Sequence, residues 1–305
     1  MGSIIQLIIS GIAMGFIYCL VAVEYTLIWN ATGLINFAHE RFIVLGAFFF
    51  GGTMVQLFSN NYVIGIIFTM AFMAVYGTIT AKVVMNPLRN MPSTLFAVMG
   101  MLMAGYVMRE AIRLIWGPNP YTIQGFMSGT FKSGGIVFSK VYVYIIIASI
   151  VLLVAQKYFM TKTKIGKAVR CVAQDKEASA LMGIDVTRNI SITVAISSMI
   201  CGLIGIFIIP VFSVSHTMAG MIALKGFAAG IVGGFGSYSG AIVGGLILGI
   251  FENLYLAFGP STYKDVVAFV LLIVVLLFKP TGIMGKSTSK GGSLRTRFMK
   301  GAAKR

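Results

Sequence analysis

Charged residues are scarce in this sequence, and acidic residues are the scarcest of all. Of its 305 residues, 24 are Lys or Arg and 8 are Asp or Glu, so that 10% are charged, whereas a soluble domain averages about 25%. A soluble fold of this size could not cover its surface with so few charges. The polar stretches 157–188 and 280–305 are each too short to bury a core alone. The composition therefore excludes a soluble enzyme or a separate catalytic domain.

Cysteine is also rare, with three residues scattered singly at Cys19, Cys171 and Cys201. Their spacing fits neither a disulfide framework nor a metal site. The N-terminus has no basic region and no small-residue cleavage signal before its apolar run continues. We therefore expect a retained membrane span there and not a signal peptide.

Long apolar runs fill most of the chain. Apolar residues make up 58% of the sequence, and the runs 42–81, 189–224 and 226–251 contain no charge. One crossing needs roughly 20 apolar residues, and turn signals rich in Gly, Pro and Asn divide the runs. We expect spans near 4–29, 34–57, 62–86, 94–116, 139–160, 189–213, 238–258 and 263–279. The predicted fold class is an all-α integral membrane protein, a bundle of about eight transmembrane helices plus a Gly-rich broken crossing.

The positions of the basic residues predict the orientation of the bundle. Lys and Arg gather in the connections 82–89 and 157–188 and in an acid-free tail at 281–305, as is typical of segments that stay in the cytoplasm. The formal charge of +16 therefore indicates orientation and not nucleic-acid binding. An outside N-terminus and a cytoplasmic C-terminus require an odd number of crossings. Segment 217–236 is the natural ninth, and its helix-breaking glycines place it in the bundle interior.

This arrangement predicts one transmembrane domain over 1–280, with a cytoplasmic loop at 161–188, followed by a basic cytoplasmic tail at 281–305. Several polar side chains interrupt the apolar segments of that domain. Charges at membrane depth are costly, so they indicate either a buried pair or a transport pathway. Both interpretations stay open for Lys225 and Glu252. The candidates for lining a pathway are Asn36, His39, Lys225 and Glu252.

The stretch from Gly166 to Asp185 carries mixed charge on short helical runs and ends at a Gly suited to a turn. One interpretation is an amphipathic helix lying on lipid headgroups. Within it, however, Glu177-Ala178-Ser179-x3-Gly183 resembles the Glu-Ala-Ala-x3-Gly loop of ABC importer permeases, which docks into a cleft on the ATP-binding subunit. The candidate residues for coupling to an ATPase are Arg170, Asp175, Glu177, Ala178, Ser179 and Gly183.

The resemblance extends over nearly the whole chain. Six motifs occur in the order expected of the permeases of branched-chain amino acid ABC transporters. They are Gly15-x2-Tyr18-x-Leu20-Val21-Ala22, Ile35-Asn36-Phe37-Ala38-His39 followed by Leu45-Gly46-Ala47, the Glu-Ala-Ser loop, Lys225-x-Phe227, Gly233-Gly234-Phe235-Gly236-Ser237-x2-Gly240-Ala241 and Leu276-Leu277-Phe278-Lys279-Pro280-x-Gly282.

The resemblance implies a permease subunit in the bacterial inner membrane. Its expected partners are a second permease subunit, two ATP-binding subunits, a periplasmic or lipid-anchored amino-acid-binding protein and membrane lipid, with no nucleic acid. The chain has no Gly-x4-Gly-Lys-Ser/Thr phosphate loop. We therefore expect no cofactor in this chain and no enzymatic activity of its own, with ATP and Mg²⁺ held by the partner subunits.

Two departures from the family pattern lie in neighbouring elements. The family usually has Gly at the position of Glu24, and Asn-Phe-Ala-His-Gly-Glu where this chain reads Asn36-Phe37-Ala38-His39-Glu40-Arg41. An acid and a base are thus introduced together at the end of one span and the start of the next. We predict that Glu24 and Arg41 form a buried pair, because neither would then be an unpaired charge at membrane depth.

The function indicated is the permease subunit of an ATP-binding cassette importer for hydrophobic amino acids, namely Leu, Ile and Val. Urea or short amides are the alternative cargo. A different class of function is a proton-coupled secondary transporter that uses Glu24, His39 and Glu252 as a relay. The stretch 166–185 argues against that class, because a secondary transporter needs no ATPase docking helix.

Overall fold

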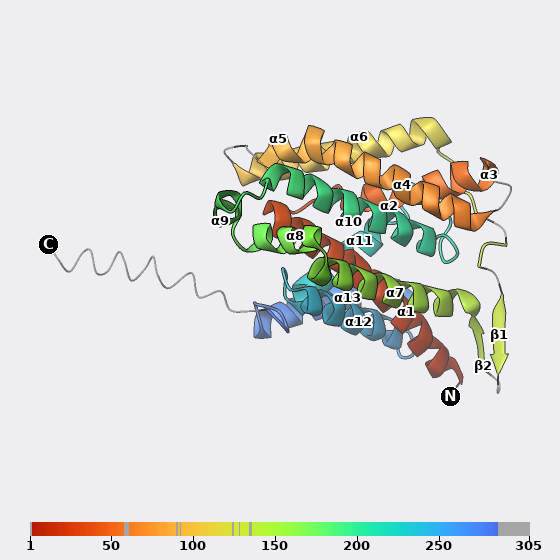
Figure 1. Ribbon diagram of the computed structural model, residues 1–305. Helices are drawn as coiled ribbons and strands as arrows, with labels where there is room; N and C mark the ends of the chain where they lie inside the picture. Colours follow the sequence, from red (N-terminus) through yellow and green to blue (C-terminus); the bar gives the residue numbers. More distant parts are fainter. Residues whose placement is uncertain are drawn as a thin grey trace.

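The structure is a computed structural model that describes residues 2–57, 61–89, 91, 93–123, 125–127, 129–133 and 136–285. The described part is a helical bundle with one small antiparallel hairpin (Figure 1). Its helices are α1 (Gly2–Thr32), α2 (His39–Phe49), α3 (Val55–Leu57), α4 (Tyr62–Thr80), α5 (Asn86–Arg89), α6 (Thr94–Trp116), α7 (Lys140–Lys162), α8 (Lys164–Gln174), α9 (Lys176–Leu181), α10 (Val186–Ile208), α11 (Gly220–Gly233), α12 (Tyr238–Tyr255) and α13 (Lys264–Phe278). Two π-helical segments, Phe50–Met54 and Ala81–Met85, continue α2 and α4, and a 3₁₀ turn, Ser261–Tyr263, precedes α13. Strands β1 (Thr130–Ser133) and β2 (Ile136–Ser139) pair Thr130 with Ser139 and Ser133 with Ile136.

Eight helical segments in the described part are long and apolar enough to cross a membrane. They are Ile5–Thr32, His39–Leu57, Tyr62–Arg89, Thr94–Trp116, Lys140–Lys162, Val186–Ile208, Tyr238–Tyr255 and Ser261–Phe278. Each corresponds to one predicted span. The prediction of an all-α membrane protein with about eight transmembrane helices is thus confirmed, because apolar length alone determines which segments can enter a bilayer.

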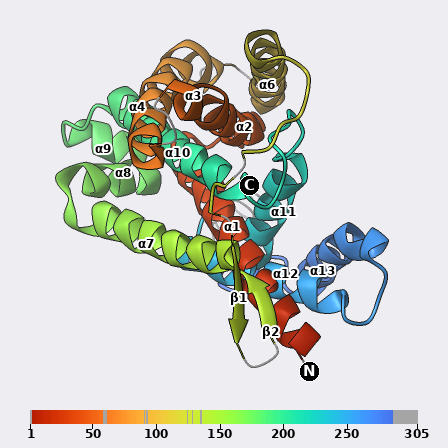
Figure 2. The same cartoon turned by 90° about the vertical axis from the view of Figure 1, so that its right-hand side faces the viewer.

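The Gly-rich segment forms α11, a shorter apolar helix of 14 residues. At 1.5 Å per residue it is about 21 Å long, less than the roughly 30 Å of a hydrocarbon core. Irregular chain at 209–219 precedes it. The segment is therefore a short helix joined to irregular chain, and it is packed against α1 and α12 in the interior (Figure 2). Its glycines were expected to break the helix, but Gly220, Gly226, Gly230 and Gly233 lie within it, where they allow close packing.

Hydrogen bonds place several chain segments at one end of the bundle. Asn30 near the end of α1 donates to the carbonyl of Gly236, which follows α11. The backbone amides of Ile283 and Met284 donate to the last turn of α11. The start of α1 lies at the other end, beside the β-hairpin (Figure 1). We call these the α9 end and the hairpin end, and their opposition agrees with an odd number of crossings.

Helix α1 lies at the centre of the bundle, surrounded by α7, α10, α11 and α12 (Figure 2). Its closest neighbour is α12, and small residues make that approach feasible. A Cβ added at Gly15 would lie 3.2 Å from the Cα of Leu246, and one added at Gly249 would collide with the backbone of Gly15. These glycines therefore set the distance between the two helices.

Candidate functional site

A cluster of charges lies where α11, α12 and α13 meet. The Lys225 Nζ lies 2.6 Å from the Glu252 Oε1 and 2.5 Å from the Asp265 Oδ1. The Lys264 Nζ lies 3.3 Å from the same Glu252 oxygen, and the Tyr18 hydroxyl of α1 donates to it at 3.4 Å. We call this group the ion cluster. It connects α1 with three helices, α11, α12 and α13, that follow one another near the other end of the described chain.

The ion cluster is balanced, with two cations and two anions. The Glu252 side chain is 0% exposed and that of Lys225 is 5% exposed, whereas Asp265 is half exposed. A charge buried to this extent is tolerated only when it is paired. Of the two interpretations that the sequence leaves open for Lys225 and Glu252, the geometry favours the buried pair.

The other two pathway candidates, Asn36 and His39, lie together at the start of α2. The Asn36 side-chain oxygen accepts a hydrogen bond from the amide of Ala38 at 3.0 Å. The His39 ring is fully buried against Tyr25, at 4.3 Å between ring centroids, with the Cys201 sulfur 3.4 Å from its Nε2. Both side chains are turned into the protein. They form a group separate from the ion cluster.

Helices α2 and α11 begin next to each other. Glu40 and Arg41 in the first turn of α2 form an ion pair with one another. The Arg41 guanidinium also donates to the carbonyl of His216 at 3.0 Å, just ahead of α11. The Glu40 carboxylate faces Gly220, the first residue of α11. We call this place the N-terminal junction.

The N-terminal junction is open on one side. Phe37 beside it is more than one-third exposed, as are Met221 and Leu224 in the first turns of α11. Two helix N-termini bring partial positive charge to this place, next to an exposed apolar surface. Sequence reasoning missed Phe37 as a site residue and treated Glu40 and Arg41 only as departures from the family. The sequence did offer a signal for Glu40 and Arg41, since both come shortly after the Asn36-Phe37-Ala38 turn.

The predicted pair between Glu24 and Arg41 is wrong. The Glu24 Oε1 accepts a hydrogen bond from the Gln156 Nε2 of α7 at 2.6 Å, and Arg41 is held by Glu40 and the carbonyl of His216. The reason is the helical rotation of about 100° between successive residues. Tyr25 faces the start of α2, so its neighbour Glu24 faces α7 and α10 instead.

The contact between Glu24 and Gln156 carries a stability prediction. Replacing Glu24 by alanine leaves the buried amide of Gln156 without its acceptor, which is expected to cost about 1 to 3 kcal/mol. Gln156→Leu alone should cost a similar amount, and the double variant should recover part of it. The measurement is unfolding in detergent. This assignment would be contradicted if the stability losses of Glu24→Ala and Gln156→Leu were additive while those of Glu24→Ala and Arg41→Gln were not.

The residues predicted to couple to an ATPase lie on α8, on α9 and in the turns at the two ends of α9, and α9 projects from the bundle (Figure 1). Asp175 caps α9 by accepting from the amide of Ala178 at 3.0 Å, and the Ser179 hydroxyl donates back to the carbonyl of Asp175 at 2.6 Å. Gly183 has φ +83°, a backbone conformation that favours glycine. Ser179 is buried and serves α9 itself, whereas Arg170, Glu177, Ala178 and Gly183 are exposed.

Two large apolar side chains form the tip of this projection. Leu181 is 89% exposed and Met182 is 83% exposed. Side chains of this kind at a protruding tip are typical of a surface that a partner covers. The sequence analysis did not select them, because the resemblance covers the Glu-Ala-Ser motif and the Gly and leaves the residues between them as x.

The projection is fixed to the bundle at two points. Val169 and Val172 of α8 are buried, and Val169 packs with Leu27 of α1. The Lys176 ammonium donates to the carbonyl of Thr32, the last residue of α1, at 2.8 Å. Burial in this contact, together with the charge of Arg89, lowers the pKa of Lys176 from its ordinary value. The C-terminal end of α1 is thereby connected directly to α9.

Comparison with known proteins adds a family to this geometry. A family model described as "Branched-chain amino acid transport system / permease component" matches residues 7–276. The chain is 29% identical over 295 residues to the high-affinity branched-chain amino acid transport system permease protein LivH of Escherichia coli (strain K12), covering 92% of this chain and 96% of the relative. It is 30% identical over 305 residues to the corresponding permease protein BraD of Pseudomonas aeruginosa, with the same coverage.

An archaeal relative is also similar. The probable branched-chain amino acid transport permease protein LivH of Methanocaldococcus jannaschii is 27% identical over 288 residues, covering 89% of each chain. No solved structure matches this chain.

Proposed function

The chain belongs to the family of branched-chain amino acid transport permease components, and on this premise we propose that it is the membrane-spanning subunit of an ATP-binding cassette importer for branched-chain amino acids. The observation that carries the proposal is the family match over residues 7–276. It favours this cargo over urea or short amides, and this class over a proton-coupled transporter. The chain is a transport subunit and not itself an enzyme.

The proposed assembly contains a second permease subunit, two ATP-binding subunits and a periplasmic or lipid-anchored amino-acid-binding protein. ATP and Mg²⁺ belong to the ATP-binding subunits. The exposed Leu181 and Met182 at the tip of α9, with Glu177 beside them, suit a docking contact with one of those subunits. The contact between Lys176 and Thr32 passes movement of that tip to α1.

The cargo path is proposed to follow the N-terminal junction. A branched-chain amino acid has a carboxylate, which helix N-termini favour, and an apolar side chain, which Phe37 and Leu224 can contact. Asn36 and His39 are buried beneath this surface and stabilise the turn that leads into α2. The second permease subunit would close the open side of the path.

Uptake by the reconstituted complex tests this function. The purified permease, assembled with its partner subunits in liposomes, is expected to accumulate labelled leucine only when ATP and the binding protein are both supplied. Excess isoleucine or valine should compete, and urea should not. Uptake driven by a proton gradient without ATP would support the secondary-transporter alternative instead.

The orientation proposed places the α9 end in the cytoplasm, the N-terminus outside and the whole chain in the inner membrane. The basic tail at 281–305 would then be cytoplasmic, although most of it lies outside the described residues. The domain boundary at 280 and the loop at 161–188 are retained in this proposal.

Cysteine labelling of intact cells tests the orientation. Cys171 is exposed and would react, whereas Cys19 and Cys201 are buried, so the experiment starts from Cys171→Ser. In that background Asn119→Cys should react with an impermeant thiol reagent from outside, because Asn119 follows α6 at the hairpin end. Lys164→Cys should react only after permeabilisation. The reverse pattern would place the α9 end outside.

A further inference from the structure

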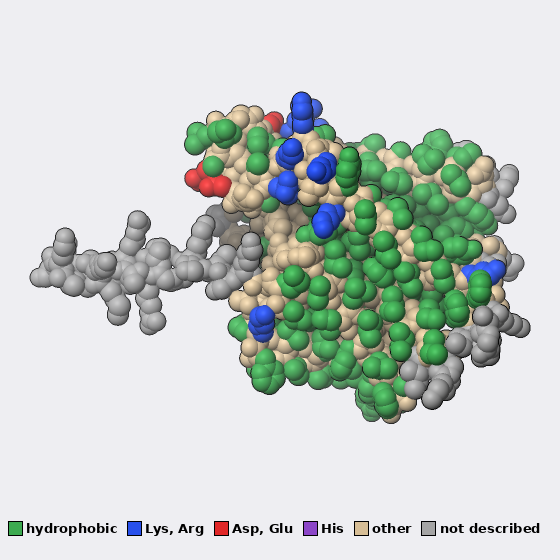
Figure 3. All heavy atoms as spheres, turned by 60° about the horizontal axis from the view of Figure 1, so that its bottom comes forward, with side chains coloured by type: hydrophobic (Ala, Val, Ile, Leu, Met, Phe, Trp, Pro, Cys, Tyr) green, Lys and Arg blue, Asp and Glu red, His purple; other side chains and the backbone are tan. Residues whose placement is uncertain are grey.

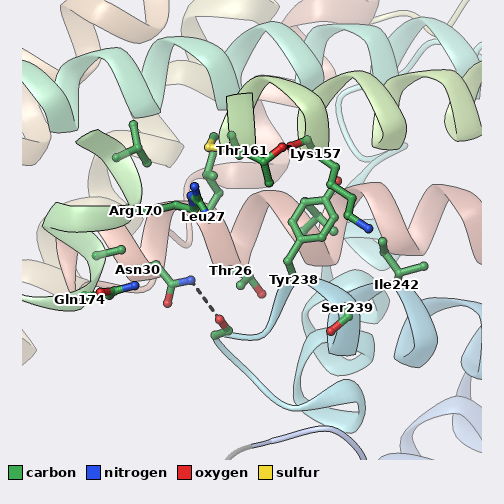
Figure 4. Close-up of a pocket in the computed structure, with 15 residues that line it drawn as sticks. Thr26, Leu27, Asn30, Lys157, Thr161, Arg170, Gln174, Tyr238, Ser239 and Ile242 are labelled. Carbon is green, nitrogen blue, oxygen red and sulfur yellow. Dashed lines mark hydrogen bonds between the residues drawn. The ribbon is translucent and has the colours of Figure 1, made fainter. Parts of the chain in front are cut away.

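A cavity of about 600 Å³ opens between α1, α7, α8 and α12 at the α9 end of the bundle (Figure 4). Its polar lining includes Lys157 and Thr161 of α7, Arg170 of α8, Thr26 of α1 and Ser239 of α12. Its apolar lining includes Val23, Leu27 and Ile242. The cavity is separate from the ion cluster and from the N-terminal junction, since it shares no residue with either.

The charges of this cavity are all positive. None of its lining residues is acidic, and neither Lys157 nor Arg170 forms an ion pair within the part of the chain that the structure describes. Figure 3 shows a group of basic side chains at this end of an otherwise largely apolar face. Figure 4 shows Lys157 and Arg170 on opposite sides of the cavity, and two unpaired cations that line one cavity favour an anionic ligand.

A buried hydroxyl in the cavity also lacks a partner. Thr26 is 2% exposed, and its Oγ1 makes no hydrogen bond to any described residue. Its neighbour Asn30 already donates to the carbonyl of Gly236 at 3.0 Å, as the dashed line in Figure 4 marks. An unpaired hydroxyl at this depth is unfavourable unless something supplies its hydrogen bond. A ligand with oxygen atoms would do so.

The side chains of α7 indicate how deep in the bilayer the cavity lies. The exposed side chains of α7 are apolar through Ile147, Val151 and Val154. Lys157 and the exposed Tyr158 come directly after them. A change from apolar side chains to a cation and an aromatic residue is typical of the headgroup level of a bilayer. The cavity is therefore at the level of the phosphates of one leaflet.

We propose that this cavity binds the headgroup of an anionic phospholipid. Lys157 contacts its phosphate from α7, Arg170 lies on the opposite side of the headgroup, Thr26 and Ser239 supply hydrogen bonds, and the acyl chains lie along the exposed apolar face of α7. A basic cavity between transmembrane helices suits this class of ligand. Free phosphate or a soluble phosphate ester uses the same cations but gains nothing from the apolar face of α7. The bound headgroup bridges α7 and α8, so it holds the base of the α9 projection against the bundle.

Lipid retention measured on the intact complex tests this proposal. The permease is purified with its partner subunits, stripped of lipid in detergent and titrated with phosphatidylglycerol, or with phosphatidylcholine of the same chains, while bound lipid is counted by native mass spectrometry. We expect phosphatidylglycerol to bind at about one molecule per chain, and phosphatidylcholine to bind clearly more weakly. Inorganic phosphate at millimolar concentration should not displace it.

Variants identify the cavity as the binding site. Lys157→Gln should weaken phosphatidylglycerol binding by about fivefold, the effect of losing one cation near a bilayer surface, and Lys157→Arg should restore it. Lys164→Gln is the matched control, because Lys164 is an exposed cation at the same end that does not line the cavity. Equal binding by Lys157→Gln and the unmodified chain would overturn the proposal, as would equal loss in Lys164→Gln. Displacement by inorganic phosphate would assign the cavity to a free anion and overturn the lipid assignment. Because lipid counting needs neither ATP nor leucine, its outcome does not depend on transport activity or on the identity of the cargo.

Discussion

Replacing Lys225 by methionine is expected to lower the stability of the folded protein by about 3 to 5 kcal/mol, the usual cost of removing one partner from a buried ion pair. Glu252 would keep the contact with Lys264 at 3.3 Å and the hydrogen bond from Tyr18 at 3.4 Å, and Asp265 would lose the cation that lies 2.5 Å away. The fully buried Glu252 carboxylate would then lack its closest cation. The measurement is a denaturant titration of the purified protein in mixed micelles.

The geometry of the ion cluster also predicts an order among the variants. Glu252→Gln should cost less than Lys225→Met, because Lys225 keeps Asp265 as a partner. Lys264→Met, which changes a more exposed cation, serves as the control and should cost the least. The double variant Lys225→Met with Glu252→Gln should recover part of the loss of Lys225→Met. Strictly additive losses would show that the two groups do not interact.

Charge placed at the tip of α9 is expected to stop transport while leaving the bundle folded. Leu181→Glu puts a carboxylate where we propose that an apolar side chain enters the ATP-binding subunit. Loss of a buried apolar anchor in an interface costs about 2 kcal/mol or more, which weakens docking by about thirtyfold. Leucine uptake should fall accordingly, and the ATP-binding subunits should no longer co-purify with the permease. Glu177→Lys should act in the same direction.

Thr187→Glu is the matched control for this experiment. Thr187 is exposed at the same end, in the first turn of α10, where an acidic side chain is compatible with the helix dipole. With Thr187→Glu, leucine uptake and the co-purification of the ATP-binding subunits should match those of the unmodified chain. Because Leu181 is almost fully exposed, Leu181→Glu should unfold at the same denaturant concentration as well. Normal uptake by Leu181→Glu would remove α9 from the coupling contact.

The membrane spans follow from local properties of the sequence, and their prediction is confirmed. Apolar length determines where a helix can cross, and the Gly-rich segment is a short helix, although its glycines lie within α11 and the irregular chain is ahead of it at 209–219. The ends of elements were less predictable. The helix expected from residue 34 begins at His39, because the chain turns through 33–38 first. The hairpin of β1 and β2 was not predicted, since its strands are only four residues each.

Contacts between distant residues could not be read from the sequence. Glu24 contacts Gln156, a neutral partner 132 positions away in the sequence. Helix α7, which carries Gln156, is mostly apolar, and the sequence analysis did not recognise that Ser149 and Gln156, two turns apart, lie on its buried face. Lys225 was recognised as significant, but its contact with Asp265 depends on where the 3₁₀ turn places α13. Which side chains pair depends on tertiary packing. A resemblance to a family predicts such a pair only when both residues belong to the family's motifs.

The tightest contact of helix α1 lies between its two ends, so it divides the helix into two arms. It runs for 31 residues, and its tightest contact is with α12 around Gly15. From there to Thr32, where Lys176 attaches α9, the helix extends about 25 Å. A tilt of about 5° at this contact moves Thr32 by about 2 Å over that length. If α1 tilts there as a rigid helix, the segment before Gly15 moves in the opposite direction, so a push at the α9 end would displace the two ends of α1 in opposite directions.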